Sequence, residues 1–166
     1  MKIASALSVC TALQVCTALL LASSVVSAAD LGTKKSMTLA AAKKIAAAAE
    51  AEAVKNKWTM VIAVLDDGAN LVYLEKMDDT QIGSIDVAVA KAASAIKFKR
   101  NTKVFEDALA GGRQAILKLP GAIPVEGGVV FMDGNRVIGA VGISGATSAQ
   151  DGVVAAAAEA EFKKLQ

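Results

Sequence analysis

The segment WTMVIAVLDDGANLVYLEKM, residues 58–77, has the clearest β-strand pattern of the chain. Two β-rich runs, 58–65 and 71–77, flank the turn residues Asp66 to Asn70, which tolerate the backbone angles that a hairpin needs. The first run is apolar at almost every position, which is typical of a strand covered on both faces. The segment therefore predicts a β-hairpin whose first strand is buried.

The remaining elements are predicted outward from this hairpin. VVFM (129–132) and residues 136–143 form a second hairpin, with its turn on Asp133-Gly134-Asn135. Helices are expected over 38–57, 82–100 and 148–164, with one or two short helices between 101 and 119. Ser148 and Asp151 have the spacing of a capping box at the start of the last helix. This order predicts a single α+β domain, a mostly antiparallel sheet flanked by helices.

The N-terminal segment has the pattern of a secretory signal. A positive start, Met1-Lys2, is followed by an apolar run over 3–21 and by the small-residue motif Val26-Ser27-Ala28. We expect cleavage after Ala28, with Ala29 as the second choice; an uncleaved membrane anchor is the rival interpretation. The mature protein is then periplasmic or secreted, away from the membrane, with a flexible lead-in over 29–36 and the domain over 37–166.

Composition excludes several classes of function. The chain has no histidine, and its two cysteines, Cys10 and Cys16, lie in the predicted signal. An imidazole base, a histidine zinc site, a proximal-histidine haem and thiolate catalysis are therefore excluded for the mature chain. The net charge of +2 gives no global field for nucleic acid. The paired aspartates at 66–67 and 78–79 fit turns, so we predict no metal site.

The segment Gly142 to Gly145 joins the last predicted strand to the last helix. It is similar to a nucleophile elbow, but glycine is missing at position 146 and no histidine is present to accept the proton of Ser144. Its backbone N–H groups suit a carboxylate or a phosphate near a helix N-terminus. They suit equally a tight turn without a ligand, and the residues alone favour that turn.

Lys91 is the unusual residue of the second predicted helix. The stripe that contains Val87, Ala88, Ala95 and Phe98 is apolar except for this lysine. Such an ammonium either reaches the surface along its apolar stem or faces a pocket where an anion neutralises it. Farther along, the basic residues from Lys97 to Lys103 are typical of a solvated helix end.

Several ordered motifs resemble one known family. They are Ser84 to Ala88 with Lys91-Ala92, Gly127-Gly128, Asp133-Gly134, Ile138 to Gly145, and Gln150-Asp151. Together they resemble the GlcG/HbpS-like family, also called the haem-degrading domain or domain of unknown function 336, over roughly residues 37–162. The resemblance implies a profilin-like fold, homo-oligomers, and association with haem or corrinoids in some members.

The resemblance also implies a site in a cleft between the second helix and the sheet. Lys91 would pair an acidic group of the ligand, Arg100 a second one, and the bend at Ser144 would offer backbone amides. Tyr73 and Met77 are the candidates for contact with haem. The implied ligand-binding residues are Ser84, Lys91, Arg100, Gly127, Gly128, Gly142, Ser144, Gly145 and Asp151.

Three functions follow as hypotheses. The resemblance and the export signal favour a periplasmic binding protein for haem or a related tetrapyrrole over an enzyme. The alternative is an enzyme, or an accessory protein, of small organic acid catabolism that binds a carboxylate at Lys91 and the Ser144 loop. The third is an oligomeric scaffold without a small ligand.

Overall fold

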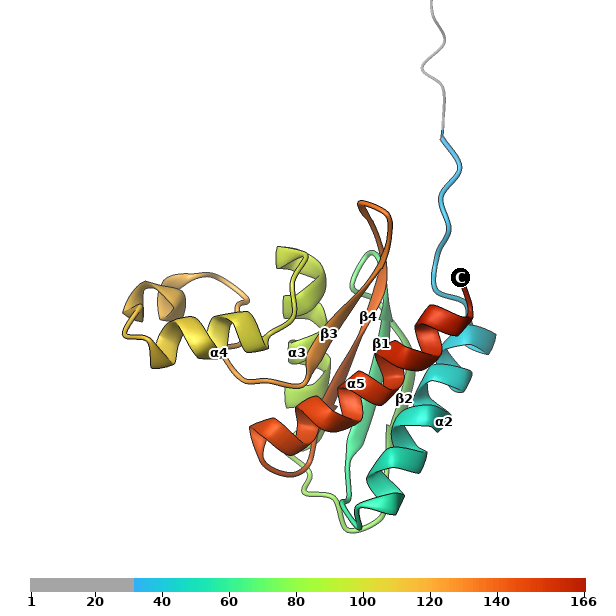
Figure 1. Cartoon of the computed structure of the whole chain (residues 1–166), viewed down its shortest axis with the longest axis horizontal. Coiled ribbons are helices and arrows are strands. Elements are labelled where there is room, and N and C mark those ends of the chain that lie inside the picture. Colours follow the sequence, from blue (N-terminus) through green and yellow to red (C-terminus); the bar gives the residue numbers. More distant parts are fainter. Residues whose placement is uncertain (1–31) are drawn as a thin grey trace, which may run out of the picture. The chain divides into compact units, whose positions relative to one another are not determined.

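The computed structural model describes residues 32–166, so the predicted signal and its cleavage site lie outside the described residues. Among the described residues, four α-helices, one 3-10 helix and four strands follow one another along the chain (Figure 1). Their bounds are α2 (Leu39–Lys55), β1 (Val61–Asp66), β2 (Leu71–Lys76), α3 (Ser84–Phe98), α4 (Lys103–Ala110), η1 (Gln114–Lys118), β3 (Gly128–Asp133), β4 (Arg136–Ser144) and α5 (Ser148–Lys164).

The sheet is antiparallel and open, with the strand order β2-β1-β4-β3. Both hairpins predicted from the sequence are present, and β1 pairs with β4 to join them. The predicted turn between β1 and β2 is built on Asp66, whose carboxylate Oδ1 accepts from the backbone N–H groups of Gly68 and Asn70, both at 2.9 Å. The single-domain α+β prediction is confirmed for residues 35–166.

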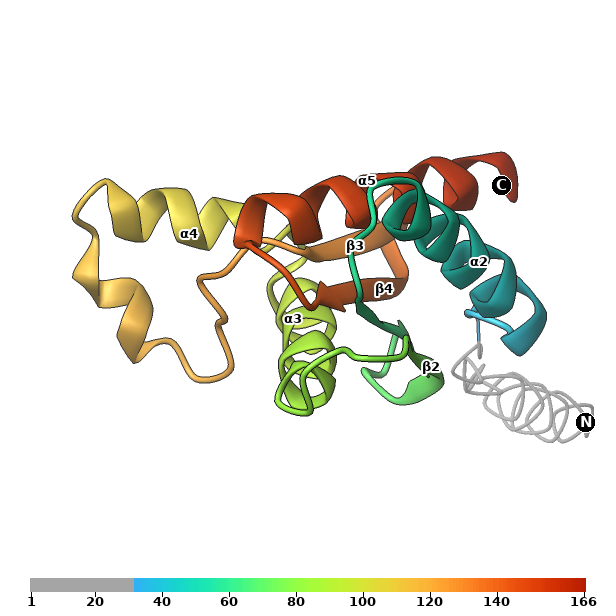
Figure 2. The same ribbon diagram turned by 90° about the horizontal axis from the view of Figure 1, so that it is seen from below.

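Helices cover both faces of the sheet. Helices α2 and α5 lie side by side on one face, and α3 lies on the other (Figures 1 and 2). Strand β1 is buried by both layers, because Ile62 and Val64 belong to the core under α2 and α5, whereas Val61, Ala63 and Leu65 belong to the core under α3. The prediction that this strand is covered on both faces is confirmed.

Alanine sets the spacing of the α2 and α5 layer. Ala42, Ala46 and Ala49 of α2 and Ala155 and Ala158 of α5 are all fully buried in one core. Alanine favours the helix and adds little bulk, so two alanine-rich faces can pack closely. The rings of Phe131 and Phe162 stack at 4.5 Å between centroids and fill the space between β3 and α5.

The start of α5 differs from its prediction in one detail. The N-cap is Thr147, and its capping box is completed by Gln150, whose side chain accepts from the Thr147 backbone N–H at 3.1 Å. The box predicted from Ser148 and Asp151 is therefore wrong by one residue. The Ser148 and Asp151 side chains make other contacts, which are described below.

Helix α4 and the 3-10 helix η1 form a lobe beside the sheet. The lobe leaves the β3 edge on the side away from α2, and both views show it standing out from the layered body (Figures 1 and 2). Thr102 fixes its base, because its backbone N–H donates to the Gly128 carbonyl oxygen at 2.9 Å and its Oγ1 accepts from the Gly128 N–H at 2.9 Å. The lobe is thus anchored to the edge strand at its start.

Candidate functional site

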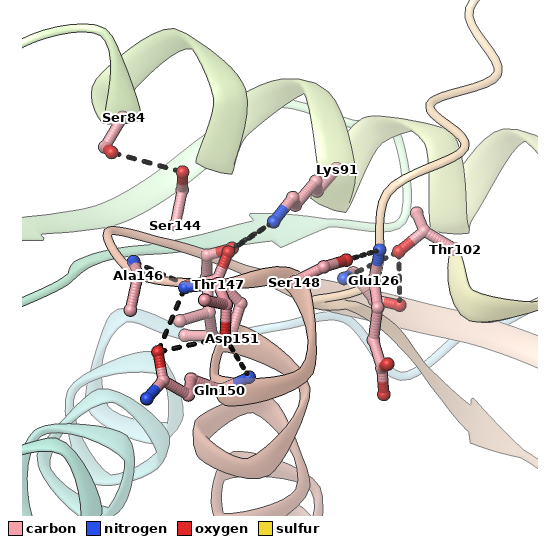
Figure 3. Close-up of polar contacts among 12 residues, drawn as sticks. Ser84, Lys91, Thr102, Glu126, Ser144, Ala146, Thr147, Ser148, Gln150 and Asp151 are labelled. Atoms are coloured by element: carbon pink, nitrogen blue, oxygen red, sulfur yellow. Dashed lines mark hydrogen bonds and ion pairs between the residues drawn. The ribbon is translucent and has the colours of Figure 1, made fainter. Parts of the chain in front are cut away.

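Lys91 lies in the interior of the protein, on the side of α3 that faces the sheet. Its side chain is fully buried. The Lys91 Nζ donates to Asp151 Oδ2 at 2.7 Å and to the Ile143 carbonyl oxygen at 3.0 Å (Figure 3). Since Asp151 belongs to the first turn of α5 and Ile143 to β4, one ammonium joins both helical layers to the sheet.

The anion that neutralises Lys91 belongs to the chain itself. The sequence left two interpretations open, a lysine that reaches the surface and a lysine that faces a pocket where an anion neutralises it. The first is wrong, because the side chain is fully buried beside a carboxylate of the chain, and a ligand anion at Lys91 stays a prediction. An uncompensated buried ammonium is unfavourable by several kcal/mol, so a carboxylate at this position stabilises the fold. Asp151, which was predicted as a ligand-binding residue, supplies that carboxylate.

Asp151 also uses the amides of the bend before α5. Its Oδ1 accepts from the Ala146 backbone N–H at 3.2 Å, and the Gly145 N–H contributes as well. Burial raises the pKa of the Asp151 carboxyl above its ordinary value, while the Lys91 ammonium and these amides oppose that rise. Lys91 and the bend therefore face the same point, as predicted, and the acid group between them is Asp151.

The backbone of α3 lies directly on the sheet at two glycines. A Cβ atom at Gly142 would lie 1.8 Å from the Ala88 carbonyl oxygen, and one at Gly128 would lie 2.5 Å from the Lys91 carbonyl oxygen. Only glycine permits this approach. The prediction of a cleft between the second helix and the sheet is wrong at these positions, because backbone contact fills the space.

Three other predicted residues also serve packing. The Ser144 Oγ donates to the Ser84 Oγ at 3.2 Å, and both side chains are buried (Figure 3). A Cβ at Gly145 would lie 2.1 Å from the Thr59 carbonyl oxygen. These contacts account for the residue types without a ligand, and a ligand contact of these residues stays a prediction.

Gly127 completes the surroundings of Lys91. Its φ of +119° lies in the region that favours glycine, and a Cβ there would lie 3.0 Å from the Lys91 Nζ and 2.7 Å from the Ile143 carbonyl oxygen. The Gly127 carbonyl oxygen accepts from the Ile143 N–H at 2.9 Å. The double glycine therefore lets the chain pass close to the buried ion pair.

A polar clamp on the lobe was missed by sequence reasoning. The Glu106 carboxylate of α4 accepts from the Ser148 hydroxyl at 2.5 Å and from the Glu126 backbone N–H. The Ser148 Oγ in turn accepts from the Glu126 N–H at 3.0 Å. This clamp joins α4 to the start of α5, and Figure 3 shows its bond between Ser148 and Glu126. Ser148 was visible in the sequence only as a helix cap, and no local pattern pointed to its partner in α4.

The two candidates for haem contact lie on or beside strand β2. The Tyr73 hydroxyl donates to Glu75 Oε2 at 2.9 Å, and this bond, with burial second, raises the pKa of Tyr73. A raised pKa disfavours the phenolate that ligates iron. Met77 lines a hollow of about 490 Å³ together with four carboxylates. The acidic walls of this hollow repel propionates, and a contact of Tyr73 or Met77 with haem stays a prediction.

Arg100 lies apart from the Lys91 group. It follows α3, its guanidinium lies 5.8 Å from the centroid of the Phe105 ring, and its Nε donates to the Phe98 carbonyl oxygen at 3.1 Å. The side chain lines a hollow beside α4 and η1. The predicted site residues therefore divide between a buried ion-pair centre around Lys91 and a surface hollow at Arg100.

Two features are absent from residues 32–166. In this part of the chain, no cluster of three or more carboxylate, imidazole or thiol side chains is arranged to hold a metal ion. None of its helices combines the length and the apolar character needed to cross a membrane.

Comparison with known proteins agrees with this architecture. Residues 37–160 match the family described as "Haem degrading protein HbpS-like". The protein GlcG of Escherichia coli K12 is 41% identical over 112 residues, covering 68% of this chain and 84% of GlcG. The solved structure of ORFY of Klebsiella pneumoniae, described as family-model DUF336, has a TM-score of 0.76 and 31% identity, covering 84% of this chain and 99% of ORFY.

A second solved structure is similar over most of its length. It is a double mutant of HbpS from Streptomyces reticuli, with a TM-score of 0.72 and 27% identity, and it covers 80% of this chain and 91% of HbpS. The resemblance noted from the sequence motifs is thereby confirmed. The family match, the GlcG relative and the shared fold together show that this chain belongs to the HbpS-like family.

Proposed function

We propose that this chain is an exported protein that binds haem or a related tetrapyrrole. The match of residues 37–160 to a family described as haem-degrading carries the proposal. The fold supports it, because the similarity to HbpS extends over most of both chains. Binding rather than turnover is proposed, since the chain contains no histidine and no cysteine beyond the predicted signal.

Export is the second part of the proposal. Its support is the sequence of residues 1–28, a positive start followed by an apolar run and a small-residue motif. Expression of the full-length sequence followed by intact-mass measurement of the periplasmic fraction tests it. A mass that starts at Ala29 is expected. An uncut chain in the membrane fraction would instead support the anchor interpretation and contradict export.

The Lys91–Asp151 pair serves this function as a framework. It connects α3, α5 and β4, so it fixes the two helical layers to the sheet. Its ammonium has a carboxylate at 2.7 Å and a carbonyl oxygen at 3.0 Å, both within the chain. A propionate would reach Lys91 only by displacing Asp151. The ligand's acid groups are therefore better served by cations on the surface.

The alternative function, binding of a small organic acid at Lys91 and the Ser144 loop, has the same obstacle. Asp151 takes both the ammonium and the Ala146 amide that such an acid would use. A thermal-shift screen separates the two functions. We expect stabilisation by hemin and none by acids of two or three carbons. Stabilisation by such an acid alone would favour the alternative.

Spectroscopic titration with hemin tests the main proposal. A saturable shift of the Soret band is expected for the wild type. We expect the same saturation for Lys91→Met once its fold is verified by circular dichroism, because the ion pair acts as a framework. If the wild type shows no saturable shift, haem binding is contradicted.

Assembly into a homo-oligomer belongs to the same proposal. The resemblance to the family supports it, and alanine-rich helix surfaces permit close subunit packing. Light scattering of the purified protein measures the molar mass directly. A mass of a single chain across the micromolar range would contradict the oligomer and leave the binding proposal in place.

A further inference from the structure

The lobe formed by α4 and η1 contains a groove with apolar walls. The groove has a volume of about 230 Å³. We call it the α4 groove, and its apolar walls are Phe98, Val104, Phe105, Ile116 and Leu119. The rings of Phe98 and Phe105 meet edge to face at 5.1 Å between centroids, so one wall is aromatic.

Parts of these apolar walls are open to solvent. Val104 is 48% exposed and Leu119 is 40% exposed. The lobe stands away from α2 in both views and touches α5 only near the start of that helix (Figures 1 and 2). Exposed apolar surface in a concave place is typical of a binding site.

Two arginines complete the lining of the groove. The guanidinium of Arg100 lies over the Phe105 ring, and Arg113 follows α4. Within residues 32–166, the Arg113 side chain has neither an ion pair nor a hydrogen bond. A free guanidinium beside apolar walls suits a carboxylate that is attached to an apolar body.

The surrounding charges are mostly positive. Residues 97–120 contain six lysines and arginines against two acids, Glu106 and Asp107. Both acids are engaged, because Glu106 accepts from the Ser148 hydroxyl and Asp107 pairs with Lys103 at 2.8 Å. The excess of cations over acids in this segment favours an anionic ligand.

We propose that the α4 groove is the tetrapyrrole site of this protein and that it holds the ligand by its ring and acid groups, without a bond to the metal. The inference rests on the proposed function. The ring edge packs on the apolar walls, and Arg100 and Arg113 pair the acid groups. No lining residue carries an imidazole, a thiol, a thioether, a phenol or a carboxylate, so the groove has no side-chain ligand for iron.

This arrangement predicts that the α4 groove binds porphyrins with and without iron about equally well. Iron-free protoporphyrin IX and hemin have the same ring and the same two propionates, so they bind with affinities within about threefold of each other. The groove is smaller than the usual range of about 300–1,000 Å³ for enclosed ligand sites, so part of the ring stays in solvent. A porphyrin bound in this way is accepted and released without a change in metal coordination.

The experiment is a fluorescence titration of protoporphyrin IX, with absorbance titration of hemin in parallel, on protein expressed from the full-length sequence. Arg113→Glu changes the charge at position 113 from positive to negative, and Val104→Asp places a negative charge on the apolar wall. The matched controls are Lys44→Glu and Val54→Asp on α2, where Lys44 is exposed and Val54 is 58% exposed. We expect each groove variant to weaken both ligands about tenfold or more, and each control to stay within about twofold.

The outcomes separate the site from the function. If the wild type binds neither porphyrin, the proposed function fails and the site fails with it. If the wild type binds and both groove variants bind equally well, only the assignment of the groove is overturned. The same holds if hemin binds at least tenfold more tightly than protoporphyrin IX, because a metal ligand is then required. A change of molar mass in the groove variants with unchanged porphyrin affinity would assign the groove to a second copy of the chain.

Discussion

The Lys91 Nζ and the Asp151 Oδ2 lie 2.7 Å apart, and both side chains are almost completely buried. The two residues are 60 positions apart in the sequence and come from helices on opposite faces of the sheet. The pair is therefore the polar link through the centre of the fold.

Removal of one partner of this pair is expected to destabilise the protein strongly. Lys91→Met leaves a buried carboxylate without its cation, and Asp151→Asn leaves a buried ammonium without its anion. Lys91→Met should lower the free energy of unfolding by about 3–5 kcal/mol, and Asp151→Asn by less, because burial already favours the neutral form of the Asp151 carboxyl. The double change should cost clearly less than the sum of the two. Urea denaturation of the four proteins measures this coupling. Additivity within about 0.5 kcal/mol would contradict the link.

The pH dependence of stability is expected to show whether burial or the attraction of Lys91 determines the pKa of the Asp151 carboxyl. Burial raises its pKa in the folded protein above the ordinary value of 3.8. The folded protein then holds the proton more tightly than the unfolded chain. The stabilisation from this group is complete below pH 3.8 and decreases as the pH rises through the folded-state pKa. The difference in unfolding free energy between the wild type and Asp151→Asn should therefore fall as the pH rises.

The Asp151→Asn variant serves as the reference in this comparison because the other carboxylates titrate alike in both proteins. A difference that grows with rising pH would mean that the attraction of Lys91 outweighs burial.

Gly142→Ala tests the direct contact between α3 and the sheet. The added methyl group would lie 1.8 Å from the Ala88 carbonyl oxygen, so the helix must move. We expect a loss of about 1–3 kcal/mol or more in the free energy of unfolding. Gly83→Ala is the matched control, because no atom lies within 4 Å of its added carbon and its φ is −63°. The control should be neutral or slightly stabilising.

Glu106→Ala tests the clamp that holds the lobe. Loss of the acceptor frees the Ser148 hydroxyl proton and leaves the Glu126 N–H bonded to the Ser148 Oγ alone, so α4 should open more often. We expect amide hydrogen exchange over residues 103–118 to accelerate about tenfold, with no change in α2. Asp107→Ala, which removes an exposed ion pair of the same helix, should leave exchange nearly unchanged. Equal acceleration in both variants would contradict the clamp.

The elements of this fold were predictable because their signals are local. The helix over 148–164 has the predicted bounds, since alanine favours the helix throughout and polar residues mark its start. The hairpin at 58–77 was found from its apolar run and its turn residues, although β1 begins only at Val61. Residues 58–60 have strand-like side chains but lie before the ladder.

The candidate site was only half predictable, because its contacts join distant segments. Lys91 is conspicuous in the sequence as the one cation on an apolar stripe, yet nothing in the sequence shows that it pairs with Asp151, 60 residues away. A glycine in a sequence is compatible with a turn, a ligand contact or close backbone packing. The sequence does not distinguish these three uses at Gly142, so it could not show whether a cleft separates α3 from the sheet. Arg113 had no local pattern to mark it, and it became a candidate only when the lobe placed it beside the aromatic wall.

The ion pair inside the fold has one more consequence. A protein that supplies the counter-ion of its own interior lysine can reach its native state empty, because no guest molecule is needed to neutralise the centre. We expect refolding to proceed equally well with and without added porphyrin.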